Sequence, residues 1–319
     1  MEENRKFTID NKRIWVAGSN GMVGKSIVRL LKERKCKLIF SDRKDLDLTD
    51  QRMVKNWMSK NKPDVIFLAA AKVGGIHANN SFPVNFLEEN LLINLNIIKN
   101  AFINQTEKLI NLGSSCVYPK NIMKPITEEQ ILSGPLEETN QWYSLAKISS
   151  IKLCQAYRRQ FNCDFISIMP SNLYGPGDNF NASSSHVPAA LIDRFHTAKI
   201  NNLEKVEVWG SGKPLREFLY VEDLAKACIF LAEHYSSDFP INVGTGEEIS
   251  IKDFAELIKK IVGFKGKIIF DKSKPDGVYK KVLNTKKVNK LGWNPTTSLE
   301  SGLTKYYQWY LNNFRSIRR

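Results

Sequence analysis

The sequence predicts an α/β fold in which a doubly wound parallel sheet is followed by a smaller mixed α/β domain. Three observations indicate this fold class. In the first half of the chain, short apolar runs alternate with longer helical segments. A glycine-rich turn joins the first apolar run to the first helical segment, and the regular alternation ends after Tyr174.

The predicted strands are nearly continuous apolar runs, which are typical of strands buried on both faces of a parallel sheet. They span residues 13–17, 38–40, 65–69, 109–112 and 165–169. Helical patterns fill the intervals between them at residues 22–34, 51–60, 83–105 and 142–161. These helices are long enough to form the right-handed crossovers that parallel strands require.

We expect two closely packed domains, residues 1–174 and 175–319, with a segment near 216–235 returning to the first domain. No stretch rich in proline, glycine or serine marks a flexible linker between them. The last residues, 315–319, have the character of a frayed end.

The composition, 42% hydrophobic and 25% charged over 319 residues, is ordinary for a folded globular protein. No apolar run reaches the roughly 18 residues that a membrane span needs. Residues 1–6 also lack the apolar stretch of a secretion signal. We therefore expect a cytoplasmic protein with no membrane partner. The five cysteines are scattered and indicate neither a metal site nor a disulfide framework.

The net charge of +14 arises from 47 Lys and Arg against 33 Asp and Glu. Such an excess is compatible with nucleic-acid binding, because phosphate backbones attract distributed positive charge. The basic residues are spread along the chain, however, and form no block. A positive field of this kind also suits an enzyme whose ligands carry phosphates, and we expect no nucleic-acid partner.

A glycine-rich motif of the form G-x-x-G-x-x-G follows the first predicted strand and opens the first predicted helix. Glycines here allow a tight turn and let the backbone approach a pyrophosphate, which the helix N-terminus attracts. The motif therefore predicts a dinucleotide-binding Rossmann domain. The candidate cofactor residues in it are Gly18, Ser19, Asn20, Gly21, Met22, Val23 and Gly24.

The end of the second strand is where the adenosine ribose of a dinucleotide is expected. An acid there favours NAD, whereas an arginine favours the 2′-phosphate of NADP. The sequence has both, in Asp42 and Arg43. We predict NADP, with Arg43 as the main discriminator, and Asp42 leaves NAD open as the alternative.

A second set of residues predicts acid–base chemistry on a carbonyl or alcohol oxygen. Tyr143 and Lys147 are four residues apart, so they share one face of the predicted helix. A nearby ammonium group lowers the pKa of a phenol and makes it a competent proton donor or acceptor. Ser114 and Cys116 follow the fourth strand, at the carboxyl end of the sheet where ligands bind.

These motifs resemble the extended short-chain dehydrogenases and, over almost the whole chain, the GDP-L-fucose synthases. The resemblance includes the Gly-Ser-Ser-Cys of residues 113–116 and the Ala-Ala-Ala-Lys-Val-Gly-Gly-Ile of residues 69–76. Other matching segments are residues 169–176, 178–180, 185–187, 208–212, 216–219, 241–246 and 273–277.

The resemblance implies an enzyme that epimerises GDP-4-keto-6-deoxy-D-mannose at C3 and C5 and reduces C4 with NADPH. A 4-keto group acidifies the protons on both flanking carbons, so one base and one acid can epimerise both centres. Cys116 matches the proposed base of the family and His186 the proposed acid. Tyr143 matches the proton donor to the C4 oxygen, with Lys147 supporting it and Ser114 polarising the carbonyl.

Binding residues also come from the resemblance. Besides the glycine-rich motif and Arg43, those implied for the cofactor are Leu112, Gly113, Ser114, Ser115, Lys147, Pro170, Ser171, Asn172, Leu173 and His186. Those implied for the GDP-sugar are Arg194, Trp209, Arg216 and Asp276. The resemblance implies no metal.

The sequence departs from the family pattern at two places, one in the cofactor site and one near the substrate site. The position of Asn20 often carries a basic residue that helps to hold the 2′-phosphate. The family's arginine a few residues after Asp276 is replaced here by Lys280 and Lys281, which lack its bidentate geometry. The departure at Asn20 bears on the preference for NADP. Because the same set of residues can serve a longer sugar, a related GDP-6-deoxy-4-keto-heptose is an alternative substrate, for a C4-reductase or epimerase.

A non-catalytic, NAD(P)-sensing regulatory protein on the same fold is the alternative from another class. Such proteins typically lose the tyrosine or the lysine, and this sequence retains both. We also predict a homodimer, because helices 83–105 and 142–161 are those that pair across a two-fold axis in dimeric members of the fold.

Overall fold

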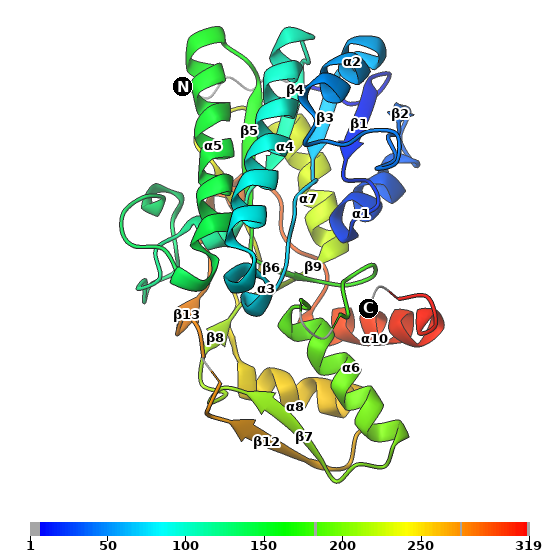
Figure 1. Ribbon diagram of the computed structural model, residues 1–319, viewed down its shortest axis with the longest axis vertical. Helices are drawn as coiled ribbons and strands as arrows, with labels where there is room; N and C mark the ends of the chain where they lie inside the picture. The colour runs from blue at the N-terminus through cyan, green and yellow to red at the C-terminus, as the bar shows by residue number, and fades with distance from the viewer. Residues whose placement is uncertain (1–6, 182–183, 275, 318–319) are drawn as a thin grey trace.

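The structure, a computed structural model, describes residues 7–181, 184–274 and 276–317 and confirms the predicted α/β fold (Figure 1). The predictions for the N-terminal residues 1–6 and for the end of the tail, 318–319, lie outside the described residues. The central sheet has six strands in the order β10-β5-β4-β3-β1-β2, and neighbouring strands pair in parallel. The strands are β1 (Arg13–Ala17), β2 (Lys37–Ile39), β3 (Val65–Leu68), β4 (Lys108–Leu112), β5 (Phe165–Pro170) and β10 (Ile241–Val243).

This strand order places a switch point between β1 and β3. From β1 the chain moves to β2 on one side, whereas β3, β4, β5 and β10 extend the sheet on the other side. Crossovers that leave in opposite directions open a crevice at the carboxyl ends of the two strands. The glycine-rich turn after β1 lies at this crevice.

Helices cover both faces of the sheet (Figure 1). On one face lie α2 (Gln51–Asn61), α4 (Pro83–Ile103) and α5 (Gln141–Phe161), with α4 packed along α5. On the other face α1 (Met22–Leu31) packs against α7 (Val221–His234). The sheet is therefore buried on both sides, as its apolar strands require.

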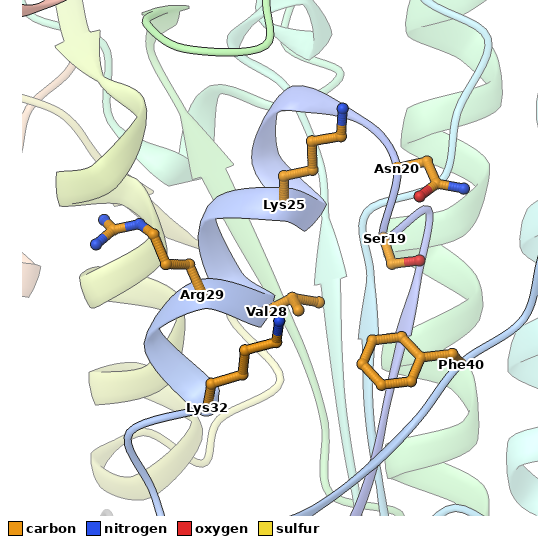
Figure 2. Close-up of a pocket in the computed structure, with 7 residues that line it drawn as sticks. All are labelled: Ser19, Asn20, Lys25, Val28, Arg29, Lys32 and Phe40. Atoms are coloured by element: carbon orange, nitrogen blue, oxygen red, sulfur yellow. The ribbon is translucent and has the colours of Figure 1, made fainter.

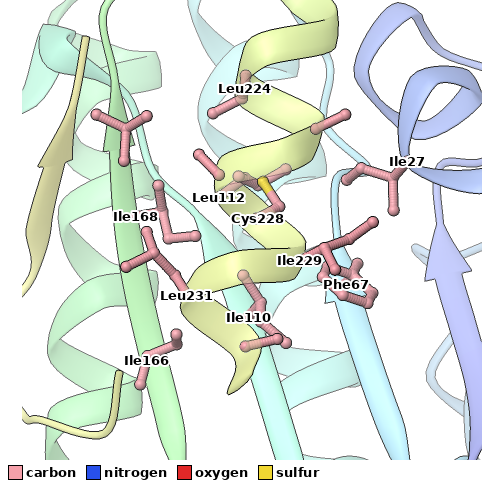
Figure 3. Close-up of a cluster of buried hydrophobic side chains, with 14 of the residues drawn as sticks. Ile27, Phe67, Ile110, Leu112, Ile166, Ile168, Leu224, Cys228, Ile229 and Leu231 are labelled. Atoms are coloured by element: carbon pink, nitrogen blue, oxygen red, sulfur yellow. The ribbon is translucent and has the colours of Figure 1, made fainter. Parts of the chain in front are cut away.

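Alternate residues of each strand supply two separate cores. Phe67 and Ile110 face α1 and α7, where they meet Ile27 and Leu231 (Figure 3). Ile66, the neighbour of Phe67, points to the opposite face and belongs to the core under α2, α4 and α5. Side chains that alternate across a strand explain why these runs are apolar without a break.

The smaller unit is built around an aromatic core. It contains α6 (Val187–Ile200), α8 (Ile251–Val262), α10 (Leu299–Asn313) and a parallel pair of strands, β7 (Lys205–Trp209) and β12 (Lys267–Asp271). The rings of Phe218 and Phe254 stack with their centroids 4.0 Å apart. Buried tyrosines of α10, among them Tyr306 and Tyr310, fill the space beside them.

Short elements lie between the two units. The helical turns are α3 (Ile76–Ser81), η1 (Ser115–Val117), η2 (Glu128–Gln130), η3 (Glu138–Asn140) and α9 (Lys286–Lys290). The strands are β6 (Asn172–Tyr174), β8 (Leu215–Arg216), β9 (Phe218–Tyr220), β11 (Ile249–Ser250) and β13 (Lys280–Lys281). β8 pairs with both β11 and β13, and β6 pairs with β9.

The predicted ends of some elements differ from the observed ones. The first helix ends at Leu31, three residues before the predicted end, because the amides of Glu33 and Arg34 bond to the carbonyls of Leu30 and Leu31. Such i to i−3 bonds tighten the chain into a turn.

Across the described residues, none of the helices combines the length and apolar character needed to cross a bilayer.

Candidate active site

The glycine-rich turn brings α1 against the end of β1. Gly18 has a φ of +87°, a left-handed conformation that favours glycine, and a Cβ added there would lie 2.7 Å from the amide nitrogen of Ala70. A Cβ added at Gly24 would lie 2.1 Å from the carbonyl oxygen of Gly18. Both glycines are therefore required by close backbone contacts.

The N-terminus of α1 is suited to hold a phosphate. Its cap is Gly21, and the first turn carries no acidic side chain. The first amides of a helix lack partners within it and carry a partial positive charge, which a pyrophosphate offsets. The residues present therefore fit a dinucleotide cofactor at the carboxyl end of β1. Arg43 lies in an exposed turn beyond β2, and Asp42 precedes it.

The ends of β4 and β5 form the next wall of this crevice. A Cβ added at Gly113 would lie 1.7 Å from the Cε of Met169, so a larger residue would displace the end of this buried side chain. The buried Lys147 donates a hydrogen bond of 2.7 Å to the carbonyl oxygen of Leu112. Pro170 ends β5, Ser171 is bonded through its amide to Val243, and β6 begins directly afterwards with Asn172 and Leu173.

Tyr143 and Lys147 lie on the first turns of α5, with the Lys147 nitrogen 5.8 Å from the centroid of the Tyr143 ring. Burial lowers the pKa of Lys147 to about 8. Burial and the nearby Cys116 raise the pKa of Tyr143, and a hydrogen bond with Ser114 opposes this rise. The lowered pKa expected from the ammonium group of Lys147 is therefore wrong, because burial outweighs it, and Tyr143 is a neutral phenol at pH 7, in the protonation state that donates a proton.

Cys116 lies on η1, directly after β4, and two side chains from elsewhere donate to its sulfur. The distances are 3.4 Å from Nδ2 of Asn140 and 3.2 Å from Nζ of Lys281. Burial raises the pKa of the Cys116 thiol. The charge of Lys281, together with hydrogen bonds from Ser114, Lys281 and Asn140, outweighs burial and lowers the pKa below its ordinary value. The site therefore favours the thiolate.

Local contacts fix η1 in this position. Ser114 caps the turn by accepting a hydrogen bond of 3.2 Å from the amide of Cys116. Ser144, on α5, donates one of 2.9 Å to the carbonyl oxygen of Cys116. Ser115 is buried beneath the turn. Cys116, Asn140 and Lys281 line a narrow pocket of about 40 Å³.

Asn140 and Lys281 are the site residues that sequence reasoning missed. Lys281 stands in a two-residue strand, β13, whose pairing with β8 is needed to bring it to Cys116. In the sequence, Lys281 is recognisable only as one of two lysines that replace the family's arginine after Asp276. Asn140 directly precedes α5, and its polar side chain so close to Tyr143 is the one local signal that could have indicated it.

His186 comes from a different segment. It is the exposed residue that precedes α6. The chain just before it packs against the turn after β3, because the amide of Gly75 donates to the carbonyl of Ser184 and a Cβ added at Gly75 would lie 2.7 Å from the carbonyl oxygen of Ser185. His186 thus lies on the loop that closes over the segment 69–76.

The four residues predicted to bind the nucleotide sugar fall into two pairs on the smaller unit. The guanidinium carbon of Arg194 lies 4.9 Å from the centroid of the exposed Trp209 ring, and Lys274 lies 5.6 Å from the same ring. The second pair is Arg216 and Asp276, whose backbone oxygen accepts a hydrogen bond of 3.3 Å from Arg216.

The chain that leads to β13 contacts both pairs, through Lys274 at the Trp209 ring and through Asp276 at Arg216. The carboxylate of Asp276 accepts two bonds from Ser211, of 2.6 Å from its amide and 2.7 Å from its hydroxyl. A Cβ added at Gly277 would lie 3.6 Å from Nη2 of Arg216 and 3.7 Å from Cδ1 of Ile76. Arg216 therefore lies near α3, which in turn packs against η3 and its residue Asn140. Arg216 and Gly277 are thus linked through α3 and η3 to Asn140, which lies beside Cys116.

Comparisons with known proteins agree with this arrangement. The sequence pattern of the NAD dependent epimerase/dehydratase family matches residues 14–244. A protein of Sinorhizobium fredii named GDP-L-fucose synthase is 52% identical over 307 residues, which are 96% of this chain and 98% of that protein.

Two solved structures share the whole fold at moderate identity. A GDP-L-fucose synthetase from Naegleria fowleri, bound to NADP, has a TM-score of 0.92 at 33% identity and covers 100% of both chains. A GDP-6-OMe-4-keto-L-xylo-heptose reductase from Campylobacter jejuni has a TM-score of 0.90 at 33% identity and covers 95% of this chain and 98% of its own.

Proposed function

Because the chain belongs to the NAD dependent epimerase/dehydratase family, we propose that it converts GDP-4-keto-6-deoxy-D-mannose to GDP-L-fucose. The proposed reaction has two parts, epimerisation at C3 and C5 and NADPH-dependent reduction at C4. The resemblance to GDP-L-fucose synthases over nearly the full length of both chains supports this substrate. The observation that carries the proposal is the Cys116 thiol, held by Lys281 and Asn140 in the region that Tyr143 borders.

The crevice at the switch point binds NADPH, which supplies a hydride to C4 of the sugar. Gly18, Gly24 and Gly113 keep the backbone clear for it, and the first amides of α1 receive its pyrophosphate. The backbone from Pro170 to Leu173 lines the nicotinamide side. Lys147 and His186 complete the set of cofactor contacts that the resemblance implies.

Reduction at C4 requires a proton for the oxygen as the carbonyl becomes an alcohol. The neutral Tyr143 phenol donates this proton, and the Ser114 hydroxyl donates a hydrogen bond to the same oxygen. The ammonium group of Lys147 stabilises the phenolate that remains. Its own position is fixed by the hydrogen bond to Leu112.

Epimerisation requires a base on one face of the sugar and an acid on the other. The Cys116 thiolate removes the proton from C3 or C5, and the 4-keto group delocalises the resulting charge as an enolate. His186 returns a proton to the same carbon from the opposite face, which inverts the centre. Because Lys281 lowers the pKa of the Cys116 thiol before the substrate arrives, it makes the thiolate easier to form and Cys116 better able to act as the base.

The smaller unit binds the GDP part of the substrate. Trp209 offers an exposed ring face on which a base can stack, with Arg194 packed on the same ring. Arg216 carries a guanidinium suited to a diphosphate oxygen. Asp276 holds the loop that carries Gly277 through its two bonds to Ser211.

The test is incubation of the protein with NADPH and GDP-4-keto-6-deoxy-D-mannose, with the product identified by NMR. GDP-L-fucose is the expected product, and Cys163→Ser, a change at a cysteine remote from the site, should leave it unchanged. A product reduced at C4 without inversion at C3 and C5 would contradict the epimerase part. Preferential turnover of a GDP-6-deoxy-4-keto-heptose would favour the alternative that the heptose reductase from C. jejuni suggests.

The enzyme forms a homodimer through α4 and α5 in the cytoplasm. Exposed apolar side chains on these adjacent helices, Leu92 and Leu95 on α4 with Trp142 and Leu145 on α5, support a self-complementary contact. The cysteines are unpaired, as in a reducing compartment. Light scattering should give twice the chain mass for the wild type and for Ile200→Arg on α6, and a monomer for Leu95→Arg. A monomeric wild type would rule out the dimer.

A further inference from the structure

A surface pocket beside the glycine-rich turn has a strongly basic lining. The pocket, of about 300 Å³, lies in front of α1 and is bordered by Ser19 and Asn20 of the turn and by Phe40 next to the end of β2 (Figure 2). The side of the pocket formed by α1 carries three cations and one apolar residue, Lys25, Arg29, Lys32 and Val28. The pocket is therefore suited to an anion.

The spacing of these residues explains why they share the pocket. Positions i, i+3, i+4 and i+7 lie on one face of a helix, and the opposite face of α1 packs into the core through Ile27 and Leu31. Like charges at such spacings repel one another. Arg29 is neutralised by Glu222 of α7 at 2.8 Å. Lys25 and Lys32 form no ion pair with any carboxylate in the part of the chain that the structure describes.

The position of the pocket indicates which anion it receives. It adjoins the turn that approaches the pyrophosphate of the bound dinucleotide, and Phe40 precedes by two residues the Asp42 that marks the ribose position. Asn20 is neutral, and the cations that line this pocket all come from α1 and the residue after it, Lys32.

We propose that Lys25 and Lys32, assisted by the polar side chains of Ser19 and Asn20, bind the 2′-phosphate of NADP and give the enzyme its preference for NADP over NAD. Arg43, the discriminator predicted from the sequence, is not among the residues that line the pocket. The ammonium groups act as point charges that bond to the phosphate oxygens. This assignment deepens the proposed function and rests on it, because it requires the dinucleotide to occupy the crevice.

The test uses two small nucleotides that differ in one phosphate, 2′,5′-ADP and 5′-AMP, with binding measured by isothermal titration calorimetry. The wild type should bind 2′,5′-ADP more tightly than 5′-AMP. The double variant Lys25→Gln/Lys32→Gln should lose roughly 10- to 100-fold of its affinity for 2′,5′-ADP, as expected for two charge-assisted hydrogen bonds. Its affinity for 5′-AMP should remain within about two-fold of the wild type, which also shows that the variant is folded.

A matched control is Lys55→Gln/Lys60→Gln, which removes two exposed lysines from α2 and should change neither affinity. Unchanged binding of 2′,5′-ADP by the α1 double variant would overturn the assignment while leaving the proposed function intact. An Arg43→Gln variant that alone abolished the preference for 2′,5′-ADP would overturn it in the same way. A wild type that bound neither nucleotide nor NADPH would instead contradict the proposed function.

Discussion

The side-chain nitrogen of Lys281 lies 3.2 Å from the sulfur of Cys116, although 165 residues separate them in the chain. Cys116 follows β4 of the sheet, whereas Lys281 belongs to β13, which β8 holds beside the smaller unit. The thiolate is thus stabilised by a residue from the other side of the site. A shift of β13 relative to the sheet would change the basicity of Cys116.

Lys281→Met should raise the pKa of the Cys116 thiol, because burial is then opposed only by the hydrogen bonds from Ser114 and Asn140. The alkylation rate of Cys116 by iodoacetamide, followed by mass spectrometry as a function of pH, measures this pKa directly. The inflection should move to higher pH in the variant. Lys280→Met is the matched control, since Lys280 forms an ion pair with Glu248 at 2.7 Å. Equal profiles for wild type and Lys281→Met would refute the role of Lys281.

Cys116→Ser and Tyr143→Phe should separate the two parts of the reaction. Serine is a far weaker acid than a thiol, so Cys116→Ser should slow the exchange of deuterium from D₂O into C3 and C5 by about 10²- to 10⁴-fold. It should still bind NADPH. Tyr143→Phe should exchange deuterium and fail to reduce C4. NMR of the sugar after incubation with each variant shows both outcomes. Exchange at the wild-type rate in Cys116→Ser would place the base elsewhere.

Gly24→Ala should destabilise the protein, because its Cβ would meet the carbonyl oxygen of Gly18 at 2.1 Å and the backbone would have to move. We expect a loss of about 1–3 kcal/mol in the free energy of unfolding, as for overpacked positions. Gly21→Ala is the control in the same motif, with its Cβ 3.4 Å from the same oxygen. Urea denaturation of the two variants measures the difference. Similar midpoints would show that the close contact is not needed.

The sequence predicted the sheet well because its strands are encoded locally. Uninterrupted apolar runs and the glycine-rich turn each lie within a few residues, and β1, β3, β4 and β5 follow from them. β10 was not predicted as a sixth strand. It has only three residues, too few to show the apolar pattern of a strand, and a long stretch of chain separates it from its neighbour β5. Its place beside β5 depends on tertiary contacts, as β propensity usually does.

The site was predictable where one segment carries the chemistry and not where segments meet. Tyr143 and Lys147 share a helix face, so their spacing alone indicates their relationship. Lys281 reaches Cys116 only through the pairing of two-residue strands, which no local pattern encodes. The basic pocket on α1 has a helical period, but its meaning required the positions of Asn20 and Phe40 beside it.

The pH dependence of NADPH binding should reflect Lys147. Burial lowers the pKa of this side chain to about 8, so the free enzyme carries the charged form below that pH and loses it as the pH rises. In the proposed mechanism, the ammonium form would bond to the cofactor ribose and stabilise the Tyr143 phenolate. The value of kcat/KM for NADPH describes the enzyme before the cofactor binds. It should therefore fall above about pH 8, approaching tenfold per pH unit.

The profile of kcat describes the complex, in which the negative charge of the cofactor would favour the ammonium form of Lys147, so kcat should fall only at higher pH. Lys147→Arg tests the assignment, since a guanidinium stays protonated throughout this range. Its maximum rate should be lower, because the planar group cannot reproduce the single bond to the Leu112 carbonyl, but the falling limb in kcat/KM should disappear. If the limb persisted unchanged in Lys147→Arg, another group would titrate near pH 8. The buried ammonium group of Lys147 would then have only a positioning role. Rates measured at a single pH cannot distinguish this role from the titration of Lys147.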